Sequence, residues 1–193
     1  MAGKKVLSGL APWDGKSLEP WRFDGDGDAQ VLSGGILALT TRSTADQWPQ
    51  TEARMVDAAS GDYATFGSYV ARLDTRGLDL ARINRIRFQI RPVCNGLHSP
   101  IVRVGFVNNG AVKIPDQYSR EGFNAINLFN NEWNECFWEM GTIAHDRMDE
   151  VSFEIHRYGK ELSTGDILYF ELKEIALEEV DEPEVVLGWQ CAQ

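Results

Sequence analysis

The feature that most constrains the fold of this chain is a two-residue alternation of apolar and polar side chains. Ile86, Phe88 and Ile90 alternate with arginines and a glutamine, and similar runs follow at 101–107, 133–140 and 151–158. Successive side chains of a β-strand point to opposite faces, so each run has one face for a core and one for the exterior. Short strands of this kind, separated by turns, are typical of a β-sandwich or barrel.

The outward positions of these runs carry Arg, Gln, Glu, His and Trp. Ordinary solvated strands carry mainly Thr, Lys, Ser and Glu at such positions. Planar hydrogen-bonding groups mixed with aromatic rings indicate a surface that recognises a polar, ring-shaped ligand.

We predict an all-β fold: an antiparallel β-sandwich (jelly roll) with two sheets and one concave outer face. A chain of 193 residues suits one domain. Residues 1–20 are expected to form an N-terminal extension and residues 21–178 the sandwich. The acidic composition of 178–184 marks residues 179–193 as a linker or the start of a following domain.

The net charge of −10 and the sequence pI near 4.8 argue against nucleic acid and anionic membranes as partners. No apolar run approaches the length of a membrane span, and no signal peptide is visible after Met1. We therefore expect neither nucleic acid nor a membrane as a partner. We also expect a monomer. Three cysteines are too few for a disulfide scaffold, and Cys136 falls on an apolar face, where we expect a small buried residue.

Asp24, Asp26 and Asp28 place three carboxylates within five residues, separated by glycines. Calcium prefers several oxygen ligands with flexible geometry, which such a loop can supply. An EF-hand is excluded because its sixth and twelfth positions would be Ala29 and Gly35. A calcium loop of another type and a solvated acidic turn both fit the segment.

The sequence holds no nucleophile elbow, phosphate loop or dinucleotide fingerprint. Its carboxylates offer no distinguishable catalytic pair, and His98, His145 and His156 are too widely spaced for a metal-binding motif. We therefore expect no catalysis by this segment. A small lyase or isomerase would need a histidine cluster or a convergent Tyr/His/Arg site.

Three segments of the chain follow a familiar pattern: Ser68–Leu80, Asn84–Pro92 and the closing run Asp166–Glu178. They resemble carbohydrate-binding-module-like jelly rolls that precede catalytic domains in bacterial polysaccharide-degrading enzymes. The resemblance implies polysaccharide binding, a structural calcium ion with Glu171 as a distant ligand, and an attached catalytic domain. It also implies a secreted, periplasmic or cell-surface parent enzyme.

The proposed ligand contacts follow from the outward positions. Trp133 is expected to stack on a sugar ring, aided by Trp48 or Tyr118. Hydrogen bonds are expected from Arg87, Gln89, Arg103, Glu135 and His156, all placed on one face. Arginines on that face suggest an acidic glycan, such as one containing uronic acid.

Two alternatives remain open from sequence. The arginines could instead pair with Glu135, Glu139 and Glu154 across strands, which would serve solubility. The domain as a whole could be a structural module that packs on its neighbour and binds no glycan. Burial of Trp133 and Phe137 against a partner would then be expected.

Overall fold

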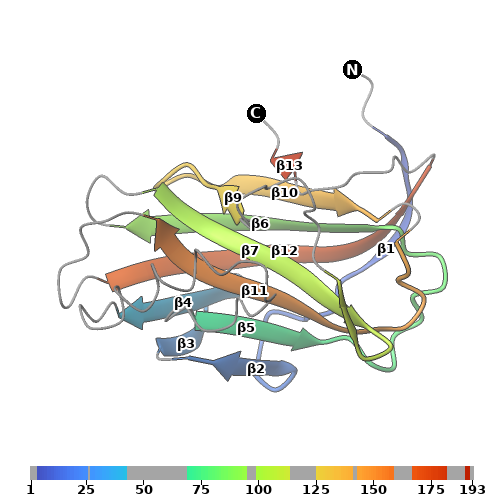
Figure 1. The fold of residues 1–193 in the computed structure, drawn as a ribbon, viewed down its shortest axis with the longest axis horizontal. Helices are drawn as coiled ribbons and strands as arrows, with labels where there is room; N and C mark the ends of the chain where they lie inside the picture. Colours follow the sequence, from blue (N-terminus) through green and yellow to red (C-terminus); the bar gives the residue numbers. More distant parts are fainter. Residues whose placement is uncertain are drawn as a thin grey trace.

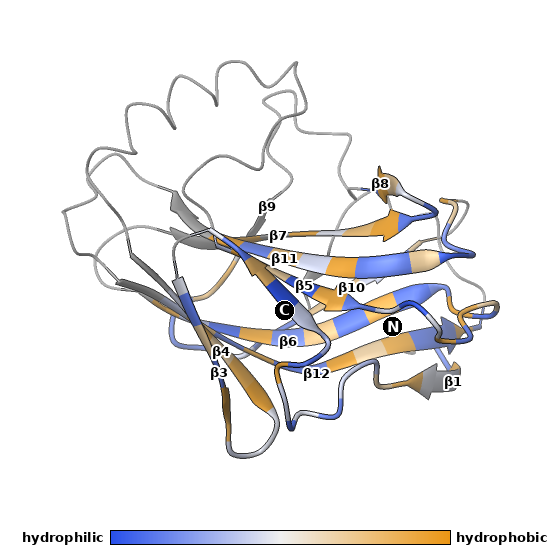
Figure 2. Ribbon diagram, turned by 90° about the horizontal axis from the view of Figure 1, so that it is seen from below, coloured by the Kyte–Doolittle hydropathy of each residue, from blue (hydrophilic) through white to orange (hydrophobic). Residues whose placement is uncertain are grey.

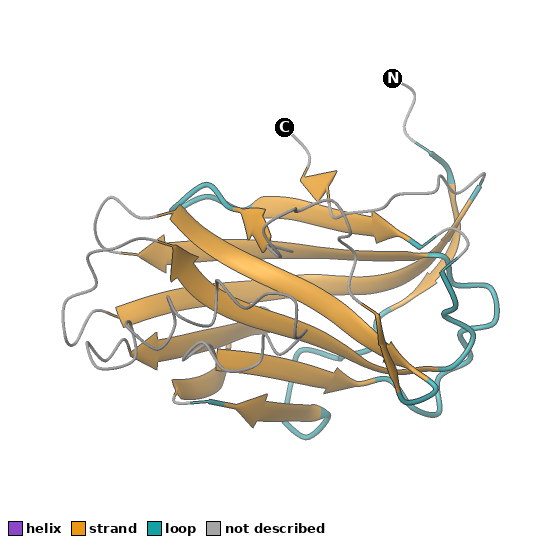
Figure 3. Ribbon diagram, viewed as in Figure 1, coloured by secondary structure: helices purple, strands orange, loops and turns teal. Residues whose placement is uncertain are grey.

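The computed structural model describes residues 4–25, 27–42, 69–94, 99–113, 125–140, 143–158, 167–181 and 190–191. These contain strands and turns and no helix, and therefore no helical segment that could span a bilayer (Figure 3). The strands are β1 (Val6–Leu10), β2 (Trp21–Asp24), β3 (Gly27–Leu32), β4 (Ile36–Arg42), β5 (Tyr69–Asp74), β6 (Arg85–Cys94), β7 (Ser99–Asn108), β8 (Ala111–Lys113), β9 (Ala125–Asn127), β10 (Asn134–Glu139), β11 (Met148–Tyr158), β12 (Ile167–Val180) and β13 (Gln190–Cys191).

The strands form two antiparallel sheets packed face to face (Figure 1). Within the described residues, sheet A has the order β13-β10-β6-β12-β4-β3, with β1 paired to the end of β12. Sheet B has the order β2-β5-β11-β7-β8, with β9 paired to β7. The predicted two-sheet antiparallel sandwich is thereby confirmed. Seen from below, the β3–β4 hairpin projects away from sheet B beyond β6 and β12 (Figure 2).

The core lies between the sheets and is built by the alternating residues. Apolar and polar residues alternate along β6 and β11 in Figure 2, and the apolar ones are buried. Trp138 and Cys136 of β10 are fully buried, as expected from sequence. The Trp138 ring lies 5.0 Å from that of Phe106 on β7, so it joins the two sheets.

The chain termini contribute more to the sandwich than their composition suggests. Residues 1–20 supply β1, which pairs with residues 177–180 of β12, and Trp13, which belongs to the core. At the other end, Val180 is buried and β13 pairs with β10. The described parts of both termini are therefore hydrogen-bonded into sheet A.

Two hairpin turns use left-handed backbone conformations. Gly34 and Gly35 lie between β3 and β4 with φ of 81° and 72°. Asn109 and Gly110, with φ of 49° and 77°, connect β7 to β8. Both positions need left-handed backbone, which glycine and asparagine tolerate best.

Gly27, at the start of β3, has no room for a side chain. A Cβ at this position would lie 2.5 Å from the carbonyl oxygen of Thr40 and 2.9 Å from the ring of Tyr69. Gly27→Ala is therefore expected to destabilise the fold by about 1–3 kcal/mol, measured by urea denaturation. Gly9→Ala is the matched control, because the nearest atom to its Cβ would be a side-chain carbon of Glu178 at 3.4 Å, an ordinary van der Waals distance. Equal stability of the two variants would contradict the close approach at Gly27.

Candidate functional site

The face of sheet A that points away from the core carries polar and aromatic side chains from three adjacent strands. We call it the outer face of sheet A. It comprises Arg85, Arg87, Gln89 and Arg91 of β6, Trp133, Glu135, Phe137 and Glu139 at β10, and Tyr169, Glu171, Lys173, Glu174 and Glu178 of β12. The register aligns these strands so that Glu135, Gln89 and Lys173 form one row across the face.

A tight turn before β10 places Trp133 on this face. The buried side chain of Asn134 holds the turn: its Oδ1 accepts from the backbone N–H of Phe129, and its Nδ2 donates to the carbonyl oxygens of Phe129, Glu132 and Ile90. The Asn131 N–H donates to the carbonyl oxygen of Pro92 at 2.8 Å, which fastens the turn to β6. Asn131 itself has φ of 63°, which asparagine tolerates better than most residues.

Trp133 is half-buried and contacts two cations of the neighbouring strands. The Arg91 guanidinium lies 5.3 Å and the Lys173 ammonium 4.2 Å from the ring centroid. Such cation–π contacts orient an aromatic ring and are worth about 0.5–1 kcal/mol at exposed sites. The indole is therefore held across β6 and reaches β12.

A bulge in β12 changes which of its residues face outward. Lys173 pairs with Gln89 and Ala176 pairs with Arg87, so β12 has one residue more than β6 over this stretch. Glu174 occupies the bulge with φ of 52°. Lys173 faces outward in the same phase as Tyr169 and Glu171, opposite the buried Phe170 and Leu172. The bulge then shifts the alternation, so that Ile175 and Leu177 enter the core and Glu178 faces outward. Strict alternation therefore places Lys173 outward, but continued past the bulge it would turn Glu178 inward.

The arginines of the outer face are paired with carboxylates. Arg85 and Arg87 both contact Glu178, at 2.5 and 2.9 Å, and Arg91 contacts Glu171 at 2.5 Å. Both glutamates are buried. The cross-strand pairing that the sequence left open is thus present for the arginines of β6, with Glu171 and Glu178 of β12 as principal partners.

Tyr169 extends the polar network along β12. Its hydroxyl donates to Oε1 of Glu171 at 2.9 Å, while Gln89 donates to Glu174 at 3.0 Å. Burial, followed by the interaction with the Glu171 carboxylate, raises the pKa of Tyr169 to about 12. The tyrosine therefore stays a neutral donor over the whole physiological range.

This raised pKa predicts a pH dependence. Because the pKa of Tyr169 is higher in the folded chain than its unfolded value of about 10, its stabilising contribution is complete below about pH 10 and is lost as the pH rises towards 12. In a tyrosinate absorbance titration, Tyr169→Phe should remove the phase near pH 12. If that phase persisted in the variant, the hydrogen bond to Glu171 could not be its cause.

The structure divides the predicted ligand contacts between the two sheets. Trp133, Arg87, Gln89 and Glu135 lie together on the outer face of sheet A. Arg103 and His156 belong to β7 and β11 of sheet B. The expectation of one shared face is therefore corrected, because alternation orients a strand without saying which strands are neighbours.

Other predicted residues are placed as follows. Trp48 and Tyr118 lie outside the described residues, and so do the side chains at 103 and 156. Arg91, Lys173 and Tyr169, which the predicted contact set omitted, belong to the same face as Trp133. All three could have been found from the alternation of β6 and of the part of β12 before its bulge.

Three of the four predicted calcium ligands, Asp24, Asp28 and Glu171, lie in the described residues. Asp24 of β2 pairs with Arg72, and Glu171 accepts from Arg91 and Tyr169. Asp28 lies on β3, and Asp26 is outside the described residues. No group of three acidic, histidine or cysteine ligands gathers in the described part of the chain. Asp24, Asp28 and Glu171 by themselves are fewer than the six to eight oxygen ligands of calcium, so the calcium site stays a prediction.

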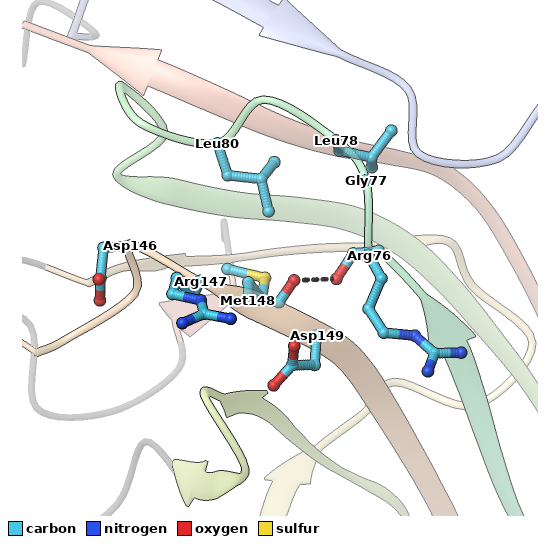
Figure 4. Close-up of a pocket in the computed structure, with 9 residues that line it drawn as sticks. Arg76, Gly77, Leu78, Leu80, Asp146, Arg147, Met148 and Asp149 are labelled. Carbon is cyan, nitrogen blue, oxygen red and sulfur yellow. Dashed lines mark hydrogen bonds between the residues drawn. The ribbon is translucent and has the colours of Figure 1, made fainter.

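A separate pocket of about 360 Å³ lies where the β5–β6 connection meets the turn before β11 (Figure 4). Leu80 and Met148 form part of its lining, and Thr75 donates to the carbonyl oxygen of Met148 at 2.8 Å. Its carboxylates are already engaged: Asp146 accepts from Asn108 and Asp149 from the N–H of Gly110.

Comparison with solved structures shows where this fold recurs. Part of an agarase, AgWH50C, matches with a TM-score of 0.54 and 10% identity, over 89% of this chain and 24% of that chain. The CBM28 module specific for non-crystalline cellulose matches with a TM-score of 0.49 and 12% identity, over 91% and 97% of the two chains. The family 11 carbohydrate-binding module of cellulase Lic26A-Cel5E of Clostridium thermocellum matches with a TM-score of 0.44 and 12% identity, over 92% and 95%.

The sequence matches no protein-family profile, and no curated protein is similar to it. The chain spans about a quarter of the agarase it matches. At 10% identity this likeness concerns the fold and not the ligand. The chain thus has the two-sheet antiparallel β-sandwich fold of a part of this agarase.

Proposed function

We propose that this chain is a non-catalytic carbohydrate-binding module that holds a polysaccharide on the outer face of sheet A. The observation that carries the proposal is the placement of Trp133, fixed by the Asn134 turn and by contacts with Arg91 and Lys173 among hydrogen-bonding side chains. A sugar ring has an apolar C–H face and polar edges. An aromatic ring beside Gln89, Glu135 and Glu174 complements both.

The proposal also covers the parent protein to which this module would belong. A match to a quarter of an agarase supports an attached glycan-degrading domain in the parent protein. Such a parent would act where polysaccharides occur, so we expect it to be secreted, periplasmic or at the cell surface. The module itself would act as a monomer.

A structural module without a glycan ligand is the second candidate. It is favoured by the ion pairs of the outer face, because Arg85, Arg87 and Arg91 are satisfied without any ligand. Under this alternative the half-buried Trp133 would pack against a neighbouring domain.

Native affinity gels containing neutral and acidic plant, algal and host polysaccharides separate the two candidates. Retarded migration in one class of polysaccharide would support the binding module. Absence of retardation in every gel would favour the structural module. Repeating the gels with a calcium chelator tests the predicted ion, since loss of retardation would support a structural calcium.

A further inference from the structure

The charges on the outer face of sheet A are matched before any ligand arrives. Five cations lie on or beside it, each within 4.0 Å of at least one of five glutamates. The cations are Lys4, Arg85, Arg87, Arg91 and Lys173, and the glutamates are Glu135, Glu139, Glu171, Glu174 and Glu178. The face so defined has no excess positive charge.

Separating the ion pairs that involve buried glutamates would destabilise the fold. Glu171 and Glu178 are only 6% and 5% exposed, and both accept from arginines of β6. An anionic sugar that drew Arg91 away would leave Glu171 buried without its cation, which is strongly destabilising. The net charge of −10 also repels a polyanion at long range.

Sugar hydroxyl groups can bind to this face without breaking its ion pairs. Each sugar hydroxyl is both a donor and an acceptor, so it can bond to an exposed edge of a paired guanidinium or carboxylate without breaking the pair. Gln89 and the exposed Glu135 offer further partners. Resting on the proposed function, we infer that the ligand of this face is an uncharged polysaccharide, recognised through its hydroxyls and one ring face.

Matched probes test this inference. The whole chain is run in affinity gels with agarose and hydroxyethyl cellulose, and with their charged counterparts carrageenan and carboxymethyl cellulose. We expect retardation by a neutral probe and none by its charged counterpart. We also expect retardation to be insensitive to added salt, because little of the interaction is between unmatched charges.

Two variants probe the charge matching directly. Glu171→Gln keeps the shape of the side chain but leaves Arg91 as an unmatched cation beside Trp133 and Lys173. We expect this variant to gain salt-sensitive retardation by carboxymethyl cellulose. Glu150→Gln is the matched control, since Glu150 is equally buried and pairs with Arg22 and Arg72 on sheet B. This control variant should gain no retardation by carboxymethyl cellulose.

The outcomes are distinguishable. Retardation by charged probes alone would overturn the inference and leave the proposed function standing, whereas no retardation by any polysaccharide would overturn both. An equal gain for Glu150→Gln, or none for a folded Glu171→Gln, would also overturn the inference. If Glu171→Gln does not fold, Glu174→Gln replaces it, because this exposed residue of the same face neighbours Arg87 and Lys173.

Discussion

Replacing Trp138 with alanine is expected to reduce the free energy of unfolding by about 3–5 kcal/mol. Trp138 is fully buried in sheet A, and its ring contacts Phe106 of sheet B with a centroid distance of 5.0 Å. The substitution would leave a cavity where the two sheets meet, and neighbouring strands that are hydrogen-bonded on both sides can close it only in part.

Urea denaturation followed by circular dichroism measures this loss. The control is Trp133→Ala, which removes the same side chain from a half-buried position on the opposite face of sheet A. It should cost about 1 kcal/mol, the value of its cation–π contacts. Comparable losses for the two variants would contradict the assignment of Trp138 to the core and Trp133 to the surface.

The same Trp133→Ala variant should lose most of the polysaccharide affinity. Central aromatic contacts of an interface commonly contribute about 2 kcal/mol or more, which corresponds to about a thirtyfold weaker Kd. The loss follows because the polar groups around Trp133 remain but no longer have an aromatic ring between them on which a sugar could stack.

Affinity gels and calorimetry with a retarding polysaccharide measure this effect. Trp133→Phe should retain part of the affinity because it keeps an aromatic ring. Arg72→Ala, on the outer face of sheet B, should retain all of it. Undiminished affinity of a folded Trp133→Ala would place the binding site elsewhere on the molecule.

Residue alternation was sufficient to identify the central strands. β6, β7, β10 and β11 all overlap runs in which apolar and polar residues alternate, whereas β5 and β12 lie in segments that carried the family resemblance. The burial of Cys136 and Trp138 followed from the same pattern. The turns at Gly34 and at Asn109 were also readable, because few residue types tolerate their backbone conformation.

The terminal and edge strands were not identified in this way. β1, β2 and β13 are short, and β1 carries mostly exposed side chains. Their stability comes from hydrogen bonds to strands far away in sequence, such as β1 to the end of β12. Backbone hydrogen bonds of this kind leave almost no trace in side-chain composition.

The candidate site also has a part that the sequence predicted and a part that only the structure revealed. Trp133, Arg87, Gln89 and Glu135 could be proposed from sequence, because each is an outward residue of an alternating run. Their grouping with Glu178 required the β12 bulge, in which one extra residue changes which side chains face outward.

The sequence by itself determined that this protein is built of β-strands and which side of each central strand faces the core. Both follow from the two-residue period of extended backbone. Only the tertiary structure decided which outward sides are neighbours. It joined β6 and β10 in sheet A and put β7 and β11 in sheet B, thereby separating Arg103 and His156 from Trp133. It also matched each arginine of β6 with a glutamate. Strand order depends on packing and backbone pairing over the whole chain, so it cannot be predicted from a local sequence pattern.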